Sequence, residues 1–266
     1  MKNYPIGIFD SGIGGLTVAN AIKNVLPNEN IVYYGDTEHL PYGEKSKKAI
    51  QSFSKKIIQF LISKKCKIIV IACNSASSFA DSSVIKTSNN IPIFNVIDPV
   101  ISEVSKIYSE DNIGVIGTKA TISSGVYEKK LKTINNNIKI NSLATPLLAP
   151  MIEEEFINES ISSTIIANYL SDKKLESIDH LILACTHYPL IQQEIKGYYK
   201  NKINVIDSAD IVAKHIKKKL EEKKMLKNEK FIEHHFYVSN FTNNFEKSAK
   251  LFFKETIKLK ELNLFF

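Results

Sequence analysis

Two cysteines in this chain stand at the same kind of position, where an apolar run gives way to small polar residues. Cys73 lies in the stretch IIVIACNSAS and Cys185 in the stretch HLILACTHYPL. A thiol has an unperturbed pKa of about 8.5, which cations, nearby bases and helix N-termini lower. Because each cysteine is expected where a strand meets the start of a helix, the helix dipole favours its thiolate. We interpret the two thiols as one pair of acid/base groups.

Each of these thiols has a titratable neighbour. Asp10 stands at the end of the first apolar run and could assist Cys73, whereas His187 follows Cys185 closely and could exchange a proton with it or with a substrate. Two opposed thiols suit one reaction in particular, in which one removes a proton from a carbon and the other delivers a proton to the opposite face. The third cysteine, Cys66, is expected to be a small buried hydrophobe.

Two thiols can oppose each other only if the fold places them on two sides of a substrate. Short β-branched runs alternate with longer amphipathic segments, and this pattern predicts an α/β fold with mainly parallel sheets. Ligands of such sheets bind beyond the carboxyl ends of the strands, which is where both cysteines stand. The expected strands are Ile6–Phe9, Ile31–Tyr34, Ile68–Ala72, Ile93–Ile97, Ile113–Ile116, Ile138–Asn141, Leu181–Ala184 and Ile203–Ile206.

A faint internal repeat indicates two similar halves. The segment IGIFDSG from Ile6 is similar to IGVIGTK, which begins 107 residues later, and the two thiol motifs lie 112 residues apart. The segments FNVIDPV and INVIDSA place Asp98 and Asp207 109 residues apart. If the two halves face each other, their strand ends line one cleft, and small-ligand sites prefer such interfaces.

Length and composition indicate a globular protein in a reducing compartment. The chain of 266 residues is 44% hydrophobic and contains three cysteines, an odd number that argues against a disulfide framework. No apolar run approaches the roughly 18 residues needed to span a bilayer. The N-terminal segment MKNYPIGIFDSG also lacks a signal-like apolar core. We therefore expect a cytoplasmic protein that is not bound to a membrane.

The positive charge of the chain comes from lysine alone. The formal net charge is +7 and all 35 basic residues are Lys. These lysines are spread along helix-like segments, which is typical of a solvated surface, and base readout favours Arg. Nucleic acid is therefore not an expected partner. Without the guanidinium fork, a bound carboxylate must be held by backbone N–H groups, hydroxyls, side-chain amides or Lys.

Six segments in this order resemble the glutamate racemases of the aspartate/glutamate racemase superfamily: FDSGIGGLTV, YYGDTEHLPYG, ACNSAS, GVIGTKATISSGVY, LACTHYPLI and IDSAD. The resemblance implies cofactor-independent interconversion of L-glutamate and D-glutamate, which supplies D-glutamate for peptidoglycan. It implies two pseudo-symmetric flavodoxin-like domains with the active site in the cleft between them. The first domain would comprise residues 1–97 and 208–266, and the second residues 98–207.

The resemblance also assigns roles to residues. Cys73 would act on the D-enantiomer with help from Asp10, Cys185 would act on the L-enantiomer with help from His187, and Glu153 matches a site carboxylate. It implies no metal and no cofactor. The family commonly forms dimers, which makes a homodimer possible here. The substrate-binding residues implied are Asp10, Ser11, Tyr42, Gly43, Asn74, Ser75, Thr118, Thr186 and His187.

Three positions depart from the family pattern. Ser75 stands where Thr is frequent and keeps the hydroxyl, and Thr145 stands where Cys is common. His39 stands where Arg is usual, which leaves the role of that cation open.

Other interpretations of the same residues are weaker. The glycines after Asp10 suggest a dinucleotide-binding loop, but the third position of G-x-G-x-x-G is Thr17 and the carboxylate would repel a pyrophosphate. We expect these glycines to allow close backbone approach to a carboxylate instead. A zinc site made by Cys73, Cys185, His187 and Asp10 has no C-x-x-C or H-x-x-x-H spacing to support it.

Two alternatives share the expected fold. A two-lobed amino-acid-binding protein could have this architecture, because a fold does not fix a function, but a binder has no need of two thiols. A racemase for aspartate or another amino acid would need the same two thiols. Substrate length is the property that distinguishes it from a glutamate racemase, and the residues alone leave that length open.

Overall fold

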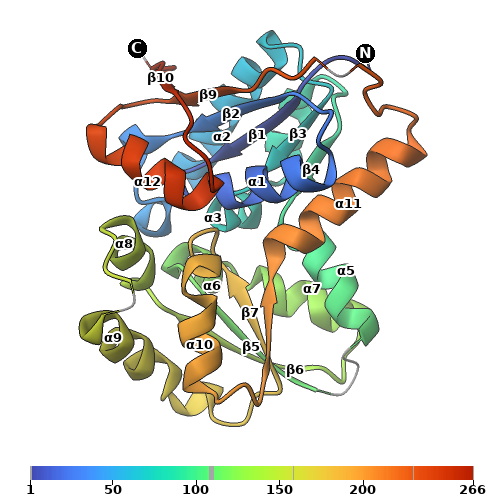
Figure 1. Ribbon diagram of the computed structural model, residues 1–266. Coiled ribbons are helices and arrows are strands. Elements are labelled where there is room, and N and C mark those ends of the chain that lie inside the picture. The colour runs from blue at the N-terminus through green and yellow to red at the C-terminus, as the bar shows by residue number, and fades with distance from the viewer. Residues whose placement is uncertain (1, 108–110, 158, 230, 266) are drawn as a thin grey trace.

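The computed structural model describes residues 2–107, 111–157, 159–229 and 231–265, and within them the strands form two parallel sheets (Figure 1). The six-stranded sheet has the order β10-β9-β2-β1-β3-β4 and the four-stranded sheet the order β6-β5-β7-β8. The first sheet contains β1 (Ile6–Asp10), β2 (Ile31–Gly35), β3 (Ile68–Ile71), β4 (Ile93–Asn95), β9 (His235–Val238) and β10 (Leu259–Glu261). The second contains β5 (Asn112–Gly117), β6 (Lys139–Ala144), β7 (His180–Ala184) and β8 (Asn204–Asp207).

The predicted α/β class and its parallel sheets are confirmed, and each predicted strand is present. The strand expected at Ile93–Ile97 is two residues too long, because the Asn95 Oδ1 accepts hydrogen bonds from the backbone N–H groups of Ile97 and Asp98 at 2.9 and 2.8 Å and starts α5 (Ile97–Ile107). Strands β9 and β10 were not predicted. They extend the first sheet after the chain has returned from the second.

Helices cover the faces of both sheets, as right-handed βα connections require. None of the helices described here is long and apolar enough to cross a bilayer. The remaining helices are α1 (Leu16–Val25), α2 (Lys47–Ser63), α3 (Asn74–Ser78), α4 (Ser82–Ile85), α6 (Lys119–Ser124), α7 (Val126–Ile134), α8 (Leu148–Glu153), α9 (Ser160–Leu170), α10 (Gln192–Tyr198), α11 (Ser208–Glu222) and α12 (Asn243–Phe253). The 3-10 turns are η1 (Thr37–His39), η2 (Tyr42–Glu44), η3 (Lys86–Ser88), η4 (Lys173–Leu175) and η5 (Tyr188–Ile191).

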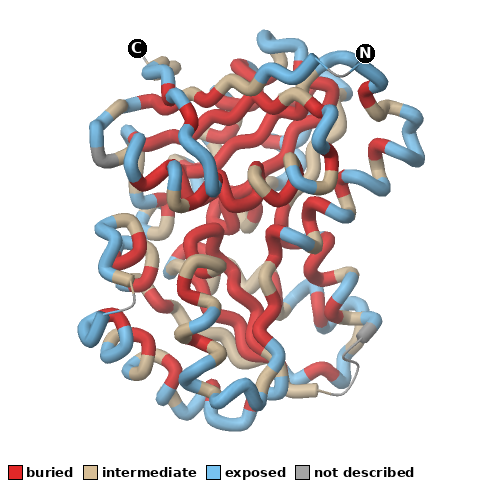
Figure 2. The backbone as a smooth tube through the Cα atoms, in the orientation of Figure 1, coloured by how far each residue is buried: buried red, intermediate tan, exposed pale blue. Residues whose placement is uncertain are grey.

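The central strands explain the uninterrupted apolar runs of the sequence. Every residue of β1, β2 and β3 is buried, because helices cover both faces of a parallel sheet (Figure 2). Helices α1, α11 and α12 cover one face of the first sheet, where Leu16, Val212 and Phe252 join a core that continues into the second sheet. Helix α2 covers the opposite face through Ile57 and Leu61. The shared core holds the two sheets in one arrangement.

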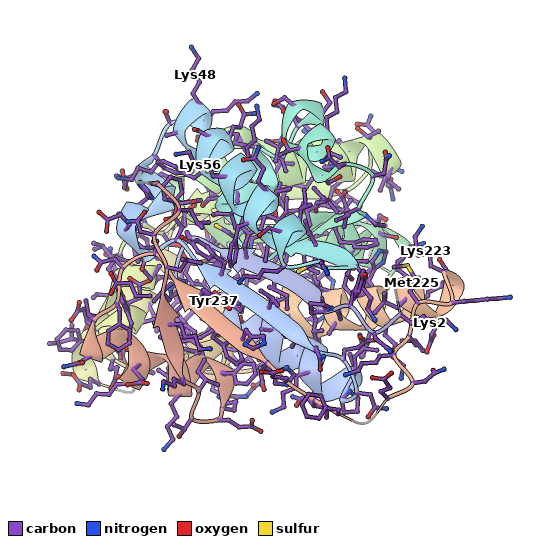
Figure 3. The ribbon with its side chains drawn as sticks, turned by 90° about the horizontal axis from the view of Figure 1, so that it is seen from above. Lys2, Lys48, Lys56, Lys223, Met225 and Tyr237 are labelled. Atoms are coloured by element: carbon purple, nitrogen blue, oxygen red, sulfur yellow. The ribbon has the colours of Figure 1, made fainter. Side chains whose placement is uncertain are left out.

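A buried ion pair links the segment after α11, where the chain returns from the second sheet, to the first sheet. The Lys67 Nζ lies 2.5 Å from the Glu29 Oε2, and both side chains are buried. The same ammonium donates to the carbonyl oxygens of Lys2 at 2.7 Å and Met225 at 2.8 Å, two residues that lie on the same side of the molecule in Figure 3. The Glu29 Oε1 accepts the Lys227 backbone N–H at 2.9 Å. One ion pair thus joins the N-terminal segment, the start of β3 and the segment after α11.

We predict that Lys67→Met lowers the free energy of unfolding by about 3–5 kcal/mol, because it leaves the Glu29 carboxylate buried without its partner. Urea denaturation followed by circular dichroism measures the change. The matched control is Lys67→Met with Glu29→Gln, which removes the charge but keeps an oxygen for the Lys227 N–H. The control should recover most of the loss. A single variant that costs less than about 1 kcal/mol would show that the pair does not hold the segment.

Candidate active site

One pocket lies between the carboxyl ends of the two sheets. It encloses about 440 Å³ of space, part of which is open to solvent. It collects the predicted cysteines and nearly all of the predicted substrate-binding residues. Its walls are formed by Ser11, Leu40, Pro41, Tyr42, Gly43, Cys73, Asn74, Ser75, Thr118, Ala149, Pro150, Glu153, Cys185, Thr186 and His187. Of the predicted site residues, Asp10 alone is absent from these walls.

Cys73 follows β3 and begins helix α3. Its Sγ accepts the Ala76 N–H at 3.4 Å and donates to the Ser11 Oγ at 3.6 Å. Burial raises the pKa of Cys73 to about 12, and the negative charge of Asp10 contributes in the same direction. The hydrogen bonds that Cys73 makes with Ala76 and Ser11 only partly oppose this rise. Cys73 is therefore a thiol that holds its proton and can donate it.

Asp10 lies behind the pocket wall, at the end of β1. Its Oδ2 accepts the N–H groups of Gly12 at 3.2 Å and Gly15 at 3.0 Å. The carboxylate that the glycine-rich turn approaches is thus the side chain of Asp10, a group of the protein itself. The Oδ1 is buried, with no hydrogen-bond partner among the described residues. Burial raises the pKa of Asp10, although His187 and the two amides act in the opposite direction.

Cys185 and His187 form a second, different acid/base unit. The Cys185 Sγ lies 3.5 Å from the His187 Nδ1, and the His187 Nε2 lies 2.8 Å from the Glu153 Oε1. Burial alone lowers the pKa of His187, but the Cys185 sulfur and the Glu153 carboxylate outweigh it and raise the pKa well above its ordinary value. The His187 imidazole can therefore exchange a proton with the Cys185 sulfur, whereas the charge that acts on Cys73 is the Asp10 carboxylate. The two predicted thiols thus sit in opposite electrostatic environments.

Neutral hydrogen-bond donors make up another part of the wall. The Ser75 Oγ lies 2.8 Å from the Thr118 Oγ1 and 3.4 Å from the Thr121 Oγ1, so a cluster of hydroxyls joins α3 of the first sheet to α6 of the second. The amide nitrogen of Asn74 is buried and has no hydrogen-bond partner among the described residues, and its Oδ1 accepts the Tyr127 hydroxyl at 2.7 Å. Such groups suit a carboxylate ligand in a chain that has no Arg.

The segment that carries Tyr42 and Gly43 is held by Asp36, a residue that the sequence analysis did not single out. The buried Asp36 carboxylate accepts hydrogen bonds from the Tyr42 hydroxyl at 2.6 Å and the Ser239 hydroxyl at 3.0 Å. The His39 Nδ1 lies 2.8 Å from its Oδ1. The signal available in the sequence was an acidic residue directly after β2, comparable to Asp10 at the end of β1.

His39, where the family usually has Arg, makes this contact with Asp36 through its imidazole ring. Its imidazole stacks on Phe53, with 4.0 Å between ring centroids, and meets the edge of the Phe265 ring at 4.3 Å. His39 thus lies behind the pocket wall between α2 and the C-terminal segment. Its part in the structure is to brace the Asp36–Tyr42 contact.

The two weaker interpretations find no support in this geometry. Within the described ranges, no group of three or more His, Cys, Asp or Glu side chains is arranged to hold a metal ion. The amides of the dinucleotide-like turn point at Asp10, and a Cβ at Gly14 would lie 2.4 Å from the His187 Cε1. That turn is filled by the protein's own side chains.

Fold and site together define an α/β enzyme with an acid/base centre between two sheets. The chain belongs to the Asp/Glu/Hydantoin racemase family, whose model matches residues 16–216. It is 40% identical to the glutamate racemase of Aquifex aeolicus, over 96% of both chains. It is 38% identical to that of Chlorobium phaeobacteroides, over 97% of this chain and 95% of the relative. The crystal structure of the Francisella tularensis glutamate racemase in complex with D-glutamate superposes with a TM-score of 0.94 at 36% identity, over 100% of this chain and 99% of that one.

We predict that iodoacetamide at pH 8 modifies Cys185 at least about tenfold faster than Cys73 or Cys66, because the thiolate is the reactive form. Burial raises the pKa of Cys73 and of Cys66 to about 12, whereas Cys185 faces a protonated imidazole. Cys73 and Cys185 are 5% and 6% exposed, so access does not distinguish them. Peptide mass spectrometry over time measures the rates.

The matched control for this labelling is His187→Asn, which should remove the advantage of Cys185. Labelling in urea should make the three rates similar. Earlier modification of Cys73 than of Cys185 in the native protein would contradict the assignment.

Proposed function

We propose that this protein interconverts L-glutamate and D-glutamate by proton transfer between two thiols, without a cofactor, and supplies D-glutamate for peptidoglycan. The observation that carries the proposal is that Cys73 and Cys185 line one pocket, with the His187 imidazole 3.5 Å from the Cys185 sulfur and the charge of Asp10 acting on Cys73. The glutamate racemases that match nearly the whole chain at 38–40% identity support glutamate as the substrate. The three free, buried cysteines fit a reducing cytoplasm as the place of action.

Domain limits at residues 1–97 with 208–266, and at 98–207, are part of this proposal. The membership of the two sheets supports them, because β9 and β10 join the strands that precede residue 98. The two strand sets then present one thiol each to a substrate held between them.

The reaction from L-glutamate uses the two thiols in their resting forms. The Cys185 thiolate takes the α-proton, so that the Cα–H bond breaks and an S–H bond forms. Cys73 gives its proton to the opposite face of the same carbon, which completes the inversion and leaves a thiolate at Cys73. The reverse reaction starts from this second state, so D-glutamate meets the Cys73 thiolate and the Cys185 thiol.

The pocket lowers the barrier by stabilising the charge that develops on the substrate. Negative charge spreads from the α-carbon into the α-carboxylate, which the hydroxyls of Ser75 and Thr118 and the Asn74 amide would hold. Preorganised donors of this kind are each worth on the order of 3 kcal/mol in other enzymes. Glu153 and Asp10 favour retention of the substrate ammonium, whose positive charge also supports the carbanion.

The proposal is tested by proton NMR in heavy water with the purified protein and no added cofactor. We expect the α-proton signals of both L-glutamate and D-glutamate to disappear and the optical rotation of each solution to decay to zero. Exchange with aspartate but not with glutamate would favour the aspartate alternative. Tight binding of glutamate with no exchange from either enantiomer would favour an amino-acid-binding protein.

We predict that Cys73→Ser and Cys185→Ser each lower kcat for racemisation by at least about 100-fold, because a hydroxyl is a far weaker acid than a thiol and positioned acid/base groups contribute 10²–10⁴-fold. Chiral chromatography of the product measures the rate. Cys66→Ser is the matched control, since Cys66 lies in the apolar core behind α2 and should leave kcat unchanged. A variant of either pocket cysteine with wild-type kcat would refute the two-thiol mechanism.

A further inference from the structure

The oxygen and the nitrogen of the Asn74 side-chain amide differ in their hydrogen bonding. Asn74 is 2% exposed and lines the pocket. Its Oδ1 accepts the Tyr127 hydroxyl at 2.7 Å, whereas its Nδ2 is buried and finds no partner in the part of the chain that the structure describes. An unpartnered donor in the interior is costly. The cost disappears when a ligand in the pocket supplies an acceptor.

The state of its amide nitrogen distinguishes Asn74 from the neighbouring hydrogen-bond donors. The hydroxyls of Ser75, Thr118 and Thr121 already bond to one another. Of the buried side-chain nitrogens and oxygens that have no partner in the described ranges, only the Asn74 Nδ2 belongs to a residue of the pocket wall. A carboxylate, which only accepts hydrogen bonds, is the ligand group that matches it.

The partner of Asn74 comes from the other half of the molecule. Tyr127 lies at the start of α7, beside the second sheet, and is 3% exposed, whereas Asn74 begins α3 after β3 of the first sheet. Burial raises the pKa of Tyr127 well above its ordinary value, so the phenol keeps its proton and remains a donor. Because the hydroxyl occupies the amide oxygen, the amide nitrogen is the end left for a ligand.

We propose that Tyr127 is a positioning residue: it orients the Asn74 amide so that the Nδ2 donates to a carboxylate of bound glutamate. Tyr127 does not line the pocket and acts through Asn74 alone. The Tyr127–Asn74 hydrogen bond joins the two halves. The Asn74 Nδ2 therefore has this orientation only when the halves have the observed arrangement. This inference rests on the proposed glutamate racemisation and names a residue that sets its substrate affinity.

The first test is Tyr127→Phe, which removes only the hydroxyl. We expect KM to rise roughly 2- to 12-fold for both enantiomers, the equivalent of one hydrogen bond, with kcat within about twofold of wild type. Combined with Asn74→Ala, Tyr127→Phe should raise KM no further, because the residue through which it acts is gone. Unchanged KM in the single variant, or equal effects in both backgrounds, overturns the proposal.

Tyr34→Phe is the matched control. Tyr34 is equally buried, but its hydroxyl donates to the Leu262 carbonyl at 2.9 Å, away from the pocket wall. This variant should keep the wild-type KM even if its melting temperature falls. A KM increase as large as that of Tyr127→Phe would show a general structural effect and overturn the proposal.

A measurement on the wild-type protein does not depend on how the variants fold. In nitrogen-15 NMR spectra, the side-chain amide signals of Asn74, assigned by their loss in Asn74→Asp, should shift when D-glutamate saturates the protein. Signals that stay unchanged at saturation overturn the inference while leaving racemisation intact. If wild-type protein neither binds nor racemises glutamate, the proposed function fails and the inference fails with it.

Discussion

Close backbone contact between the two halves, at Gly14 and Gly43, is the constraint on which the shared pocket depends. A Cβ at Gly14 would lie 2.4 Å from the His187 Cε1, and a Cβ at Gly43 would lie 2.9 Å from the Thr118 Cβ. A Cβ at either position would force the side chain opposite it, His187 or Thr118, to shift. The Thr17 hydroxyl holds the same contact by donating to the Thr186 carbonyl at 2.9 Å. At this separation, Cys73 from the first half and Cys185 from the second line the same pocket.

This proximity also creates the difference between the thiols, because each buried sulfur responds to the charges that the fold places beside it. The negative charge of Asp10 disfavours a thiolate at Cys73, whereas the His187 imidazole, whose pKa is raised, lies 3.5 Å from the Cys185 sulfur. A two-thiol mechanism needs one proton donor and one proton acceptor at the start of every turnover. The internal repeat gives the two halves similar strands, and the neighbours of the cysteines break the symmetry. Glu153 of α8 contributes to this electrostatic difference, because its Oε1 lies 2.8 Å from the Nε2 of the His187 imidazole.

Much of this architecture could be predicted from the sequence, because buried parallel strands give uninterrupted β-branched runs and their carboxyl ends carry the polar motifs. Strand β10 could not be, since this edge strand is only three residues long and two of them, Lys260 and Glu261, are exposed. The Asp36 contacts were missed for another reason. Their partner Ser239 lies 203 residues away, and only the added β9 brings it beside β2. Asp10 was expected to line the pocket, yet its carboxylate accepts hydrogen bonds from the backbone N–H groups of Gly12 and Gly15 instead. The spacing of these residues in the sequence does not reveal which way the side chain points.

The absence of Arg from the chain gives the arrangement of the halves a further consequence. A guanidinium would bind a carboxylate from one side, wherever the opposite wall stood. Here the donors are neutral groups, and Ser75 of the first half bonds at 2.8 Å to Thr118 of the second. Neutral donors attract a carboxylate strongly only when several are fixed together in a site without bulk water. Recognition of the substrate is therefore a property of the two halves in contact, and Gly14 and Gly43 lie where these halves approach each other closely.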